Sequence, residues 1–153
     1  MERVASQVQV DNYLRLQFPS RSENESLARV AVASFVAQLD PTVEELTELK
    51  TAVSEAVTNA IIHGYEDREG EVRVECALFD RTVRIVIEDA GVGIPDIEEA
   101  RQPLYTSRPE LERSGMGMTI MESFVDMLEV DSTLGQGTRV TMVKTFGAEP
   151  NLM

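Results

Sequence analysis

The sequence is short of several residue types on which common active sites depend. It contains one cysteine, Cys76, one histidine, His63, and two lysines, Lys50 and Lys144. A single cysteine excludes an intrachain disulfide, and one cysteine with one histidine falls short of the ligand sets typical of zinc sites. Neither lysine follows a glycine-rich loop, which excludes a P-loop. No Gly-x-Ser-x-Gly motif accompanies His63, so a Ser-His-Asp hydrolase would lack its nucleophile.

Long apolar runs and an excess of positive charge are also absent. No run of about 18 apolar residues occurs, and residues 1–13 lack the continuous apolar stretch of a signal peptide. The formal charge of −13, from 14 basic and 27 acidic residues, opposes nonspecific attraction to nucleic acid or anionic lipid. We therefore expect a cytoplasmic protein with no membrane partner and no direct nucleic-acid partner.

The length of 153 residues and the hydrophobic fraction of 42% suit one domain with a real core, and we expect its ends, 1–11 and 147–153, to be flexible. Strands that follow one another directly favour a two-layer α/β sandwich, in which a mixed, mostly antiparallel sheet carries helices on one face. Periodicity predicts strands over 12–18, 71–78, 82–89, 128–133 and 138–146, and helices over 22–39, 40–64 and 116–128.

Two of the predicted helices begin with the spacing of a capping box. Ser22 precedes Glu25 by three residues, and Thr42 precedes Glu45 by three residues. Gly64 stands in the stop position of the second helix. These signals predict where the first two helices begin and where the second one ends.

The second predicted helix has a polar edge beside its apolar stripe. Glu55, Asn59 and His63 recur every four residues, and at about 100° per residue they centre roughly 120° from the stripe. An ordinary amphipathic helix would give the same arrangement, so periodicity alone assigns no function to the edge. The stripe consists of Leu46, Leu49, Val53, Val57 and Ala60.

The end of the strand over 82–89 carries the pattern Asp-x-Gly-x-Gly, formed by Asp89, Gly91 and Gly93. A carboxylate at a strand end can accept a hydrogen bond from an exocyclic amine such as that of adenine. Glycines let a flat ring approach the backbone closely. A strand followed by an ordinary glycine turn explains the same pattern, so this motif is weak when taken alone.

A second glycine pair, Gly115 and Gly117, stands at the start of the third predicted helix. Free backbone N–H groups and the positive end of a helix attract anions, and Arg113 could add a charge-assisted contact to phosphate. A flexible hinge explains this pair equally well. The preceding segment, residues 90–115, is long for a compact domain, and loops of that length are usually lids or binding loops.

Taken together, these three elements resemble the GHKL ATPase superfamily in order and spacing. The segments "SRSENES", "FVAQLDPT", "EAVTNAIIHGY" and "GVGIPDIEEARQPLYTSRPELERSGMGMTIM" narrow the resemblance to the anti-sigma F factors, across roughly residues 14–146. The resemblance implies a Bergerat fold that binds ATP or ADP with Mg²⁺. It also implies a homodimer that binds a sporulation sigma factor of the sigma-F type and phosphorylates a serine of an anti-anti-sigma protein.

The same resemblance implies roles for individual residues. Glu55 would be the general base, Asn59 the magnesium ligand and Asp89 the residue that reads adenine. Hard oxygen donors such as the Asn59 amide suit magnesium and add no negative charge beside a triphosphate. The other residues that the resemblance places at the nucleotide are Gly91, Gly93, Arg113, Ser114, Gly115, Gly117 and Thr138.

Two alternatives compete with the kinase hypothesis. In the first, the chain is a sigma-binding module with little kinase activity, in which nucleotide acts as a conformational switch. In the second, the chain is the catalytic half of a histidine kinase, which is disfavoured because no helix with a phosphoacceptor precedes the motifs. His63 lies inside the nucleotide motif and is interpreted as a structural group.

Overall fold

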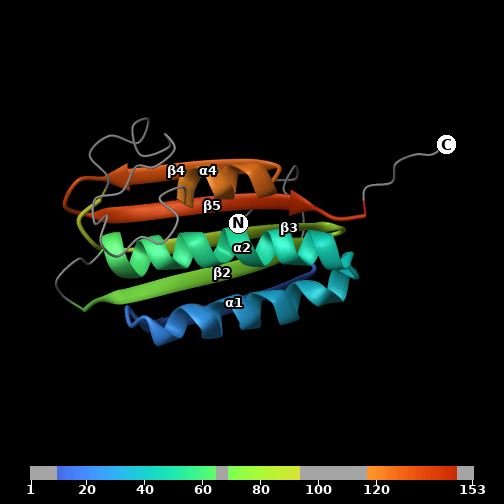
Figure 1. Cartoon of the computed structure of the whole chain (residues 1–153), viewed down its shortest axis with the longest axis horizontal. Helices are drawn as coiled ribbons and strands as arrows, with labels where there is room; N and C mark the ends of the chain where they lie inside the picture. Colours follow the sequence, from blue (N-terminus) through green and yellow to red (C-terminus); the bar gives the residue numbers. More distant parts are fainter. Residues whose placement is uncertain (1–9, 65–68, 94–116, 148–153) are drawn as a thin grey trace, which may run out of the picture.

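The computed structural model describes residues 10–64, 69–93 and 117–147 as two packed layers, helices over a sheet (Figure 1). The helices and strands follow one another along the chain in the order that the periodicity predicts. Their bounds are β1 Asn12–Pro19, α1 Glu23–Val36, η1 Ala37–Leu39, α2 Val43–Asn59, η2 Ala60–Gly64, β2 Glu71–Phe79, β3 Thr82–Asp89, α4 Gly117–Phe124, β4 Met127–Thr133 and β5 Gly137–Thr145.

The sheet has five strands in the order β1-β2-β3-β5-β4. All four neighbouring pairs are antiparallel, so the predicted α/β sandwich is confirmed and its sheet is entirely antiparallel within the described residues. The two predicted hairpins are present as β2–β3 and β4–β5. The crossover from β3 to β4 leaves room for β5 between these two strands, so β4 is an edge strand.

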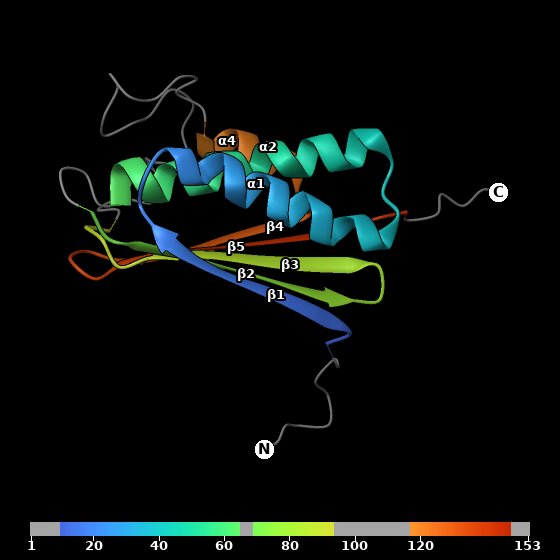
Figure 2. The same cartoon turned by 90° about the horizontal axis from the view of Figure 1, so that it is seen from below.

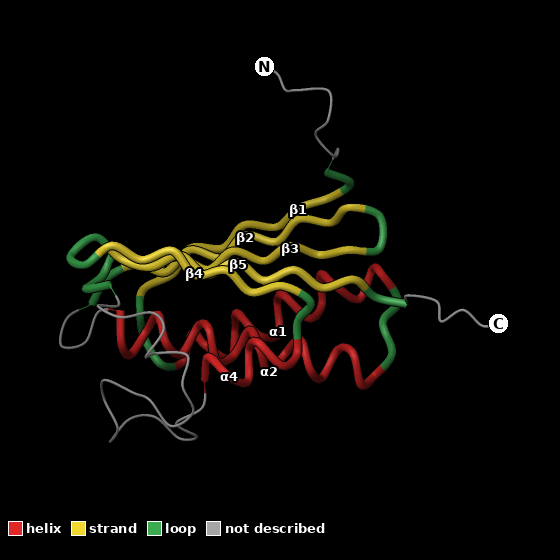
Figure 3. The backbone as a smooth tube through the Cα atoms, turned by 90° about the horizontal axis from the view of Figure 1, so that it is seen from above, coloured by secondary structure: helices red, strands yellow, loops and turns green. Residues whose placement is uncertain are grey.

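All the described helices cover one face of the sheet and leave the other face bare (Figures 2 and 3). The alternation along each strand explains this asymmetry. In β1, Leu14, Leu16 and Phe18 pack against the core, while Arg15 and Gln17 point away and bond to Glu75 and Glu71 on β2. A sheet with one apolar face and one charged face buries only the former.

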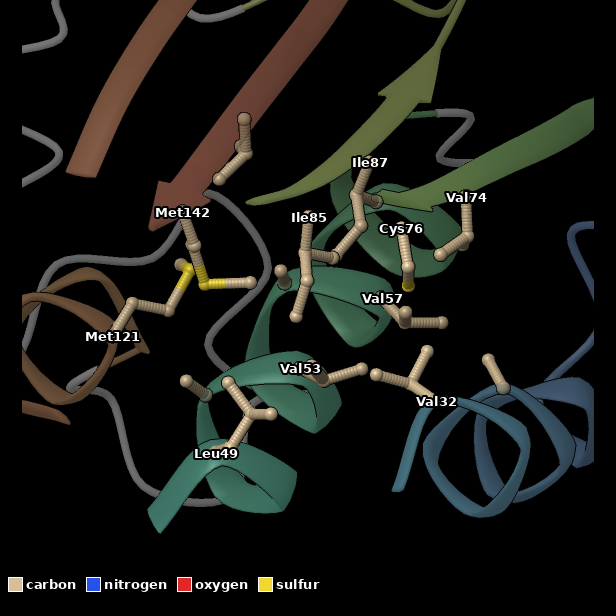
Figure 4. Close-up of a cluster of buried hydrophobic side chains, with 14 of the residues drawn as sticks. Val32, Leu49, Val53, Val57, Val74, Cys76, Ile85, Ile87, Met121 and Met142 are labelled. Atoms are coloured by element: carbon tan, nitrogen blue, oxygen red, sulfur yellow. The ribbon is translucent and has the colours of Figure 1, made fainter. Parts of the chain in front are cut away.

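The core lies between α2 and the three central strands, with α1 and α4 on either side of α2 (Figure 4). Leu49, Val53 and Val57 of the predicted apolar stripe are at most 1% exposed. Cys76 is fully buried among them, and burial raises the pKa of its thiol to about 12. The cysteine therefore acts as a small apolar core residue, as the sequence suggests.

One of the two predicted capping boxes is confirmed and the other is wrong. The Thr42 hydroxyl accepts from the Glu45 N–H at 3.0 Å, and the Glu45 carboxylate accepts from the Thr42 N–H at 2.8 Å. Ser22 makes no cap bond, because its backbone is already helical, at φ −55° and ψ −37°. The Glu25 carboxylate instead accepts from Ser54 of α2 at 2.5 Å and from Arg29 at 3.1 Å.

The third helix ends earlier than its apolar periodicity predicts. It stops at Phe124, and β4 begins at Met127 rather than Leu128. The Asp126 N–H donates to the Val143 carbonyl of β5 at 2.9 Å, and the Asp126 carboxylate accepts from the Thr145 N–H at 2.8 Å. These bonds to β5 turn the chain into the sheet where the sequence pattern alone continues the helix.

The N-terminal end of α2 is fastened to its surroundings by what we call the anchored end, formed by Leu39, Thr42, Glu45, Arg81 and Phe146. The Arg81 guanidinium donates to the Phe146 carbonyl at 2.8 Å and to the Leu39 carbonyl at 3.3 Å. The Phe146 ring is fully buried, and the Gly147 N–H donates to the Glu45 carboxylate at 3.2 Å.

No helix within the described residues is both long and apolar enough to cross a membrane.

Candidate functional site

The polar edge of α2 lies beside its buried stripe, as periodicity predicts. Glu55 and Asn59 are half-buried, and Ala56 and Val57 between them are at most 1% exposed. The two polar residues are one turn apart and share a face of the helix. On another side of α2, the Ser54 hydroxyl donates to Glu25 of α1 at 2.5 Å, and this bond ties the two helices together next to the edge.

The edge ends in a π-helical turn, η2, which runs from Ala60 to Gly64. Ala60 and Ile61 are buried at 4% and 7% exposure, and η2 contacts both β3 and β5. Single π-helical turns in α-helices frequently occur at functional sites. The backbone of His63 belongs to this turn, and Gly64 closes it, which confirms Gly64 as the end of the helical segment.

Three polar side chains lie side by side at one end of the strands β3, β5 and β4. We call them the polar row: Asp89, Thr138 and Ser132. Asp89 of β3 is paired with Thr138 of β5, and Thr138 is paired with Ser132 of β4. The next row on the same face, two residues along each strand, is Ile87, Val140 and Val130, which belongs to the apolar core. The helix-facing side of the sheet therefore changes from apolar to polar at this end.

The loop after β3 is held by Asp89 and by the β4–β5 turn. The Asp89 carboxylate accepts from the Gly91 N–H at 2.9 Å, and the Val92 carbonyl accepts from the Gly135 N–H at 2.8 Å. Gly93 has φ +81°, and a Cβ there would lie 2.6 Å from the Thr133 carbonyl oxygen. Gly93 thus permits a close backbone approach, and the group it approaches is the neighbouring turn.

Gly137, at the first position of β5, is a residue that the sequence analysis passed over. Its φ is +113°, and a Cβ at this position would collide with the carbonyl oxygen of Asp89 and come within 2.7 Å of Ala90 Cα. Only glycine lets β5 pack this closely on the residue that carries the predicted adenine-binding carboxylate. The strand pairing of β3 with β5 shows what this glycine contacts.

The structure brings most of the predicted site residues to one end of the sandwich, which we call the site end. Asn59, Asp89, Gly91, Gly93 and Thr138 lie at the C-terminal end of α2 or at the sheet end that η2 contacts. Glu55 is one turn earlier on α2, and Gly117 begins α4, which packs against α2. Arg113, Ser114 and Gly115 lie outside the described residues, as does most of the predicted lid over 90–115.

A hollow of about 520 Å³ opens at the same end of the sheet, reaching the bare face. Its lining includes Glu69, Glu71, Glu88 and Asp89, whereas its one arginine, Arg73, is paired with Glu88 at 3.5 Å. The concentration of carboxylates repels a triphosphate. This hollow is therefore an unfavourable place for the phosphates of a nucleotide.

The donor set at the site end fits magnesium that is bound mainly by phosphate. Within the described ranges, no three His, Cys, Asp or Glu side chains cluster closely enough to hold a metal by themselves. Magnesium usually takes one or two protein oxygens and completes its shell with phosphates and water. The half-buried amide of Asn59 can supply one such oxygen.

Comparison with known proteins identifies the family. Residues 18–144 match the histidine kinase-like ATPase domain. The chain is 58% identical to the anti-sigma F factor of Clostridium kluyveri over 138 residues, which cover 90% of this chain and 97% of that one. It is 62% identical to the anti-sigma F factor of Geobacillus stearothermophilus over 136 residues, covering 88% and 93%. The chain belongs to the anti-sigma F factor family.

The anti-sigma F factor of Clostridium beijerinckii is equally similar, at 62% identity over 137 residues that cover 89% of this chain and 96% of the relative. A crystal structure of the RsbU and RsbW domains of a Mycobacterium tuberculosis protein matches with a TM-score of 0.64 at 20% identity. That match covers 88% of this chain but 32% of the other, and it shows the fold alone. The ATPase domain of the anti-sigma F factor family implies nucleotide binding, and the predicted family resemblance is confirmed.

Proposed function

We propose that this member of the anti-sigma F factor family is an anti-sigma factor and a protein-serine kinase. It would bind and inhibit a sporulation sigma factor of the sigma-F type and use Mg-ATP to phosphorylate a serine of an anti-anti-sigma protein. The two protein partners are proposed from the family resemblance. A homodimer in the cytoplasm is proposed on the same ground. The observation that supports the proposal is that the polar edge of α2 and the polar row lie at the same end of the sandwich, where η2 contacts β3 and β5.

In this proposal the base of ATP lies against the polar row. The Asp89 carboxylate, which accepts from the Gly91 N–H, would also accept from the exocyclic amine of adenine. Thr138 is directly across from Asp89 on β5. Gly91, Gly93 and Gly117, with Arg113, Ser114 and Gly115, would provide backbone and charge around the nucleotide.

The phosphates would lie along the polar edge of α2. Phosphoryl transfer depends mainly on positioning and on neutralising charge, and magnesium supplies part of that neutralisation when it is bound. Asn59 would hold the metal through its amide oxygen. Glu55, one helical turn earlier on the same face, would accept the proton from the attacking serine hydroxyl. The hydrogen bond between Ser54 and Glu25 links α2 to α1 at the residue before this base.

A nucleotide-switched sigma-binding module with little kinase activity is the second candidate. The bond from Ser54 to Glu25, and the ion pair from Glu25 to Arg29 at 3.1 Å, connect α2 to the partly exposed side of α1. A change at the nucleotide could reach a partner bound on α1 through these contacts. A switch requires that the sigma factor bind with different affinity to the ATP and ADP states.

The test is to incubate the full chain with γ-labelled ATP, magnesium and a candidate anti-anti-sigma protein, and then to map the labelled residue. The kinase proposal expects label on a serine of the added protein. No label, combined with sigma affinity that differs between ATP and ADP, would favour the switch. No label and equal sigma affinity would contradict both candidates.

A further inference from the structure

A polar contact joins α1 to α2 directly beside the proposed base. The Ser54 hydroxyl donates to the Glu25 carboxylate at 2.5 Å, and the same carboxylate oxygen accepts from the Arg29 guanidinium at 3.1 Å. A distance this short is typical of a charge-assisted hydrogen bond, which is about twice as strong as a neutral one. The Glu25 side chain is only 17% exposed, so water competes weakly for this bond.

This contact lies beside an interface built from apolar side chains. Ala28, Val32 and Val36 of α1 are at most 1% exposed, and Val32 points toward Val53 of α2 (Figure 4). Apolar contacts are nondirectional, so a helix can turn slightly about its axis while keeping most of them. A hydrogen bond weakens steeply when its angle changes, so the bond from Ser54 resists such a rotation of α2.

Small rotations of α2 matter for a general base on that helix. Side chains extend about 5–6 Å from a helix axis, so a rotation of about 10° moves the end of a side chain by roughly 1 Å. A misplacement of about 1 Å can slow a reaction by about 10²-fold. Glu55 follows Ser54 directly and moves with it. Asn59 is one turn further on, where the buried residues of η2 contact β3 and β5 and hold the helix independently.

We propose that Ser54 is a positioning residue for phosphate transfer, because its bond to Glu25 holds α2 in the rotation at which Glu55 meets the attacking serine hydroxyl. The inference rests on the proposed function, since it assumes that Glu55 is the base. Ser54 acts through the helix backbone and need not touch ATP or the protein substrate. Loss of the bond should therefore lower the rate of transfer more than the affinity for ATP.

The test is a double-mutant cycle on the full chain, with kcat for transfer to an anti-anti-sigma protein and the Kd for ATP measured separately. Ser54→Ala should lower kcat by about ten- to a hundredfold and keep the Kd for ATP within about twofold. Alanine favours the helix, so this variant should fold. Ser54→Thr keeps the hydroxyl and should restore most of the rate. In Glu25→Ala, where the bond is already lost, adding Ser54→Ala should lower kcat no further.

Thr51→Ala is the matched control. The Thr51 hydroxyl also lies on α2, but it donates to the Thr47 carbonyl of the same helix at 3.0 Å. Its loss should leave both kcat and ATP affinity unchanged. An unchanged kcat in Ser54→Ala, an equal loss of kcat and ATP affinity, or an equal fall in Thr51→Ala overturns the role of Ser54 while leaving the kinase proposal intact. If the unmodified chain transfers no phosphate, the proposed function fails and this inference fails with it.

Discussion

The two ends of α2 differ in what surrounds them. At the anchored end, α2 begins in a capping box, and nearby side chains bond to backbone groups. At the site end, α2 continues into a π-helical turn that lies over the polar row. At the anchored end, the Arg81 guanidinium donates hydrogen bonds to two backbone carbonyls. At the second end, Asp89, Thr138 and Ser132 stand on three adjacent strands. The same helix therefore has one end that is held by structural hydrogen bonds and one end that carries the candidate functional site.

The backbone shows the same difference. Asp40 and Asp80, at the anchored end, have φ values of +55° and +59°, in the left-handed region that aspartate adopts readily. Gly137, at the site end, has φ +113° and packs directly on the backbone of Asp89. Substitutions at the anchored end should therefore change stability, and substitutions at the site end should change binding or transfer.

The largest expected effect comes from Glu55→Gln, which removes the proposed base. We expect phosphate transfer to an anti-anti-sigma protein to slow by about 10²- to 10⁴-fold, while ATP affinity stays near normal. The control is Glu48→Gln, on the same helix but paired with Lys144 at 3.6 Å. It should cost at most about 1 kcal/mol of stability and leave transfer unchanged. The measurement is the initial rate of phosphate transfer from labelled ATP in both variants. A near-normal rate in Glu55→Gln rules out Glu55 as the base.

Gly137→Ala should lower both the stability of the fold and the affinity for ATP. Its Cβ would collide with the Asp89 carbonyl, so β5 or Asp89 must move and the backbone is strained by about 1–3 kcal/mol. Gly135→Ala, at φ +82° with nothing within 4 Å of the added Cβ, should lose about 1 kcal/mol from backbone strain and retain full ATP affinity. Urea unfolding and nucleotide titration of both variants test this. Equal affinity in the two variants would contradict the close packing of Gly137 on the site.

The capping boxes allow a comparison that involves no ligand. Thr42→Ala should destabilise the fold by about 1 kcal/mol, because it removes a cap that the Glu45 N–H uses at 3.0 Å. Ser22→Ala, which has the same motif spacing but no cap bond, should stay within about 0.5 kcal/mol of the unmodified chain. Denaturant unfolding measures both changes. A loss in Ser22→Ala as large as that in Thr42→Ala would show that the first box does form.

The smallest expected effect is a pH dependence at the anchored end. The Thr42 N–H, together with the Gly147 N–H and Lys144, holds the pKa of Glu45 below its ordinary value. A carboxyl whose pKa is lowered by folding stabilises the fold above its unfolded pKa and loses that contribution as the pH falls through the folded pKa. Unfolding free energies from neutral to acid pH should therefore fall less steeply in Glu45→Gln. Identical slopes would contradict the shift.

Sequence reasoning succeeded where one local signal decides the outcome. Thr42 with Glu45 gave a true cap, Gly64 marked the end of the helical segment, and alternation placed both hairpins. It failed where a distant partner competes. Glu25 is drawn away from Ser22 by Ser54, 29 residues further on, and the bonds of Asp126 to β5 cut the third helix short.

The site itself was predicted in part. Periodicity placed Glu55 and Asn59 on one edge, and the family resemblance pointed to Asp89 and Thr138. The pairing of Thr138 with Ser132, and the contact of Gly137 with Asp89, depend on the strand order β3-β5-β4. A single sequence contains no local signal for that order, so these two residues emerge only from the fold.

The central claim is that the site end binds ATP through Asp89, and titration of ATP into Asp89→Asn tests it most directly. The amide oxygen can still accept from the Gly91 N–H, but its NH₂ group replaces the carboxylate oxygen proposed to face adenine. We expect ATP affinity to fall about 10- to 100-fold, as for the loss of a charge-assisted hydrogen bond. Glu88→Gln, the neighbouring carboxylate that pairs with Arg139 at 3.0 Å on the bare face, should bind ATP normally. Unchanged ATP affinity in Asp89→Asn would contradict the account.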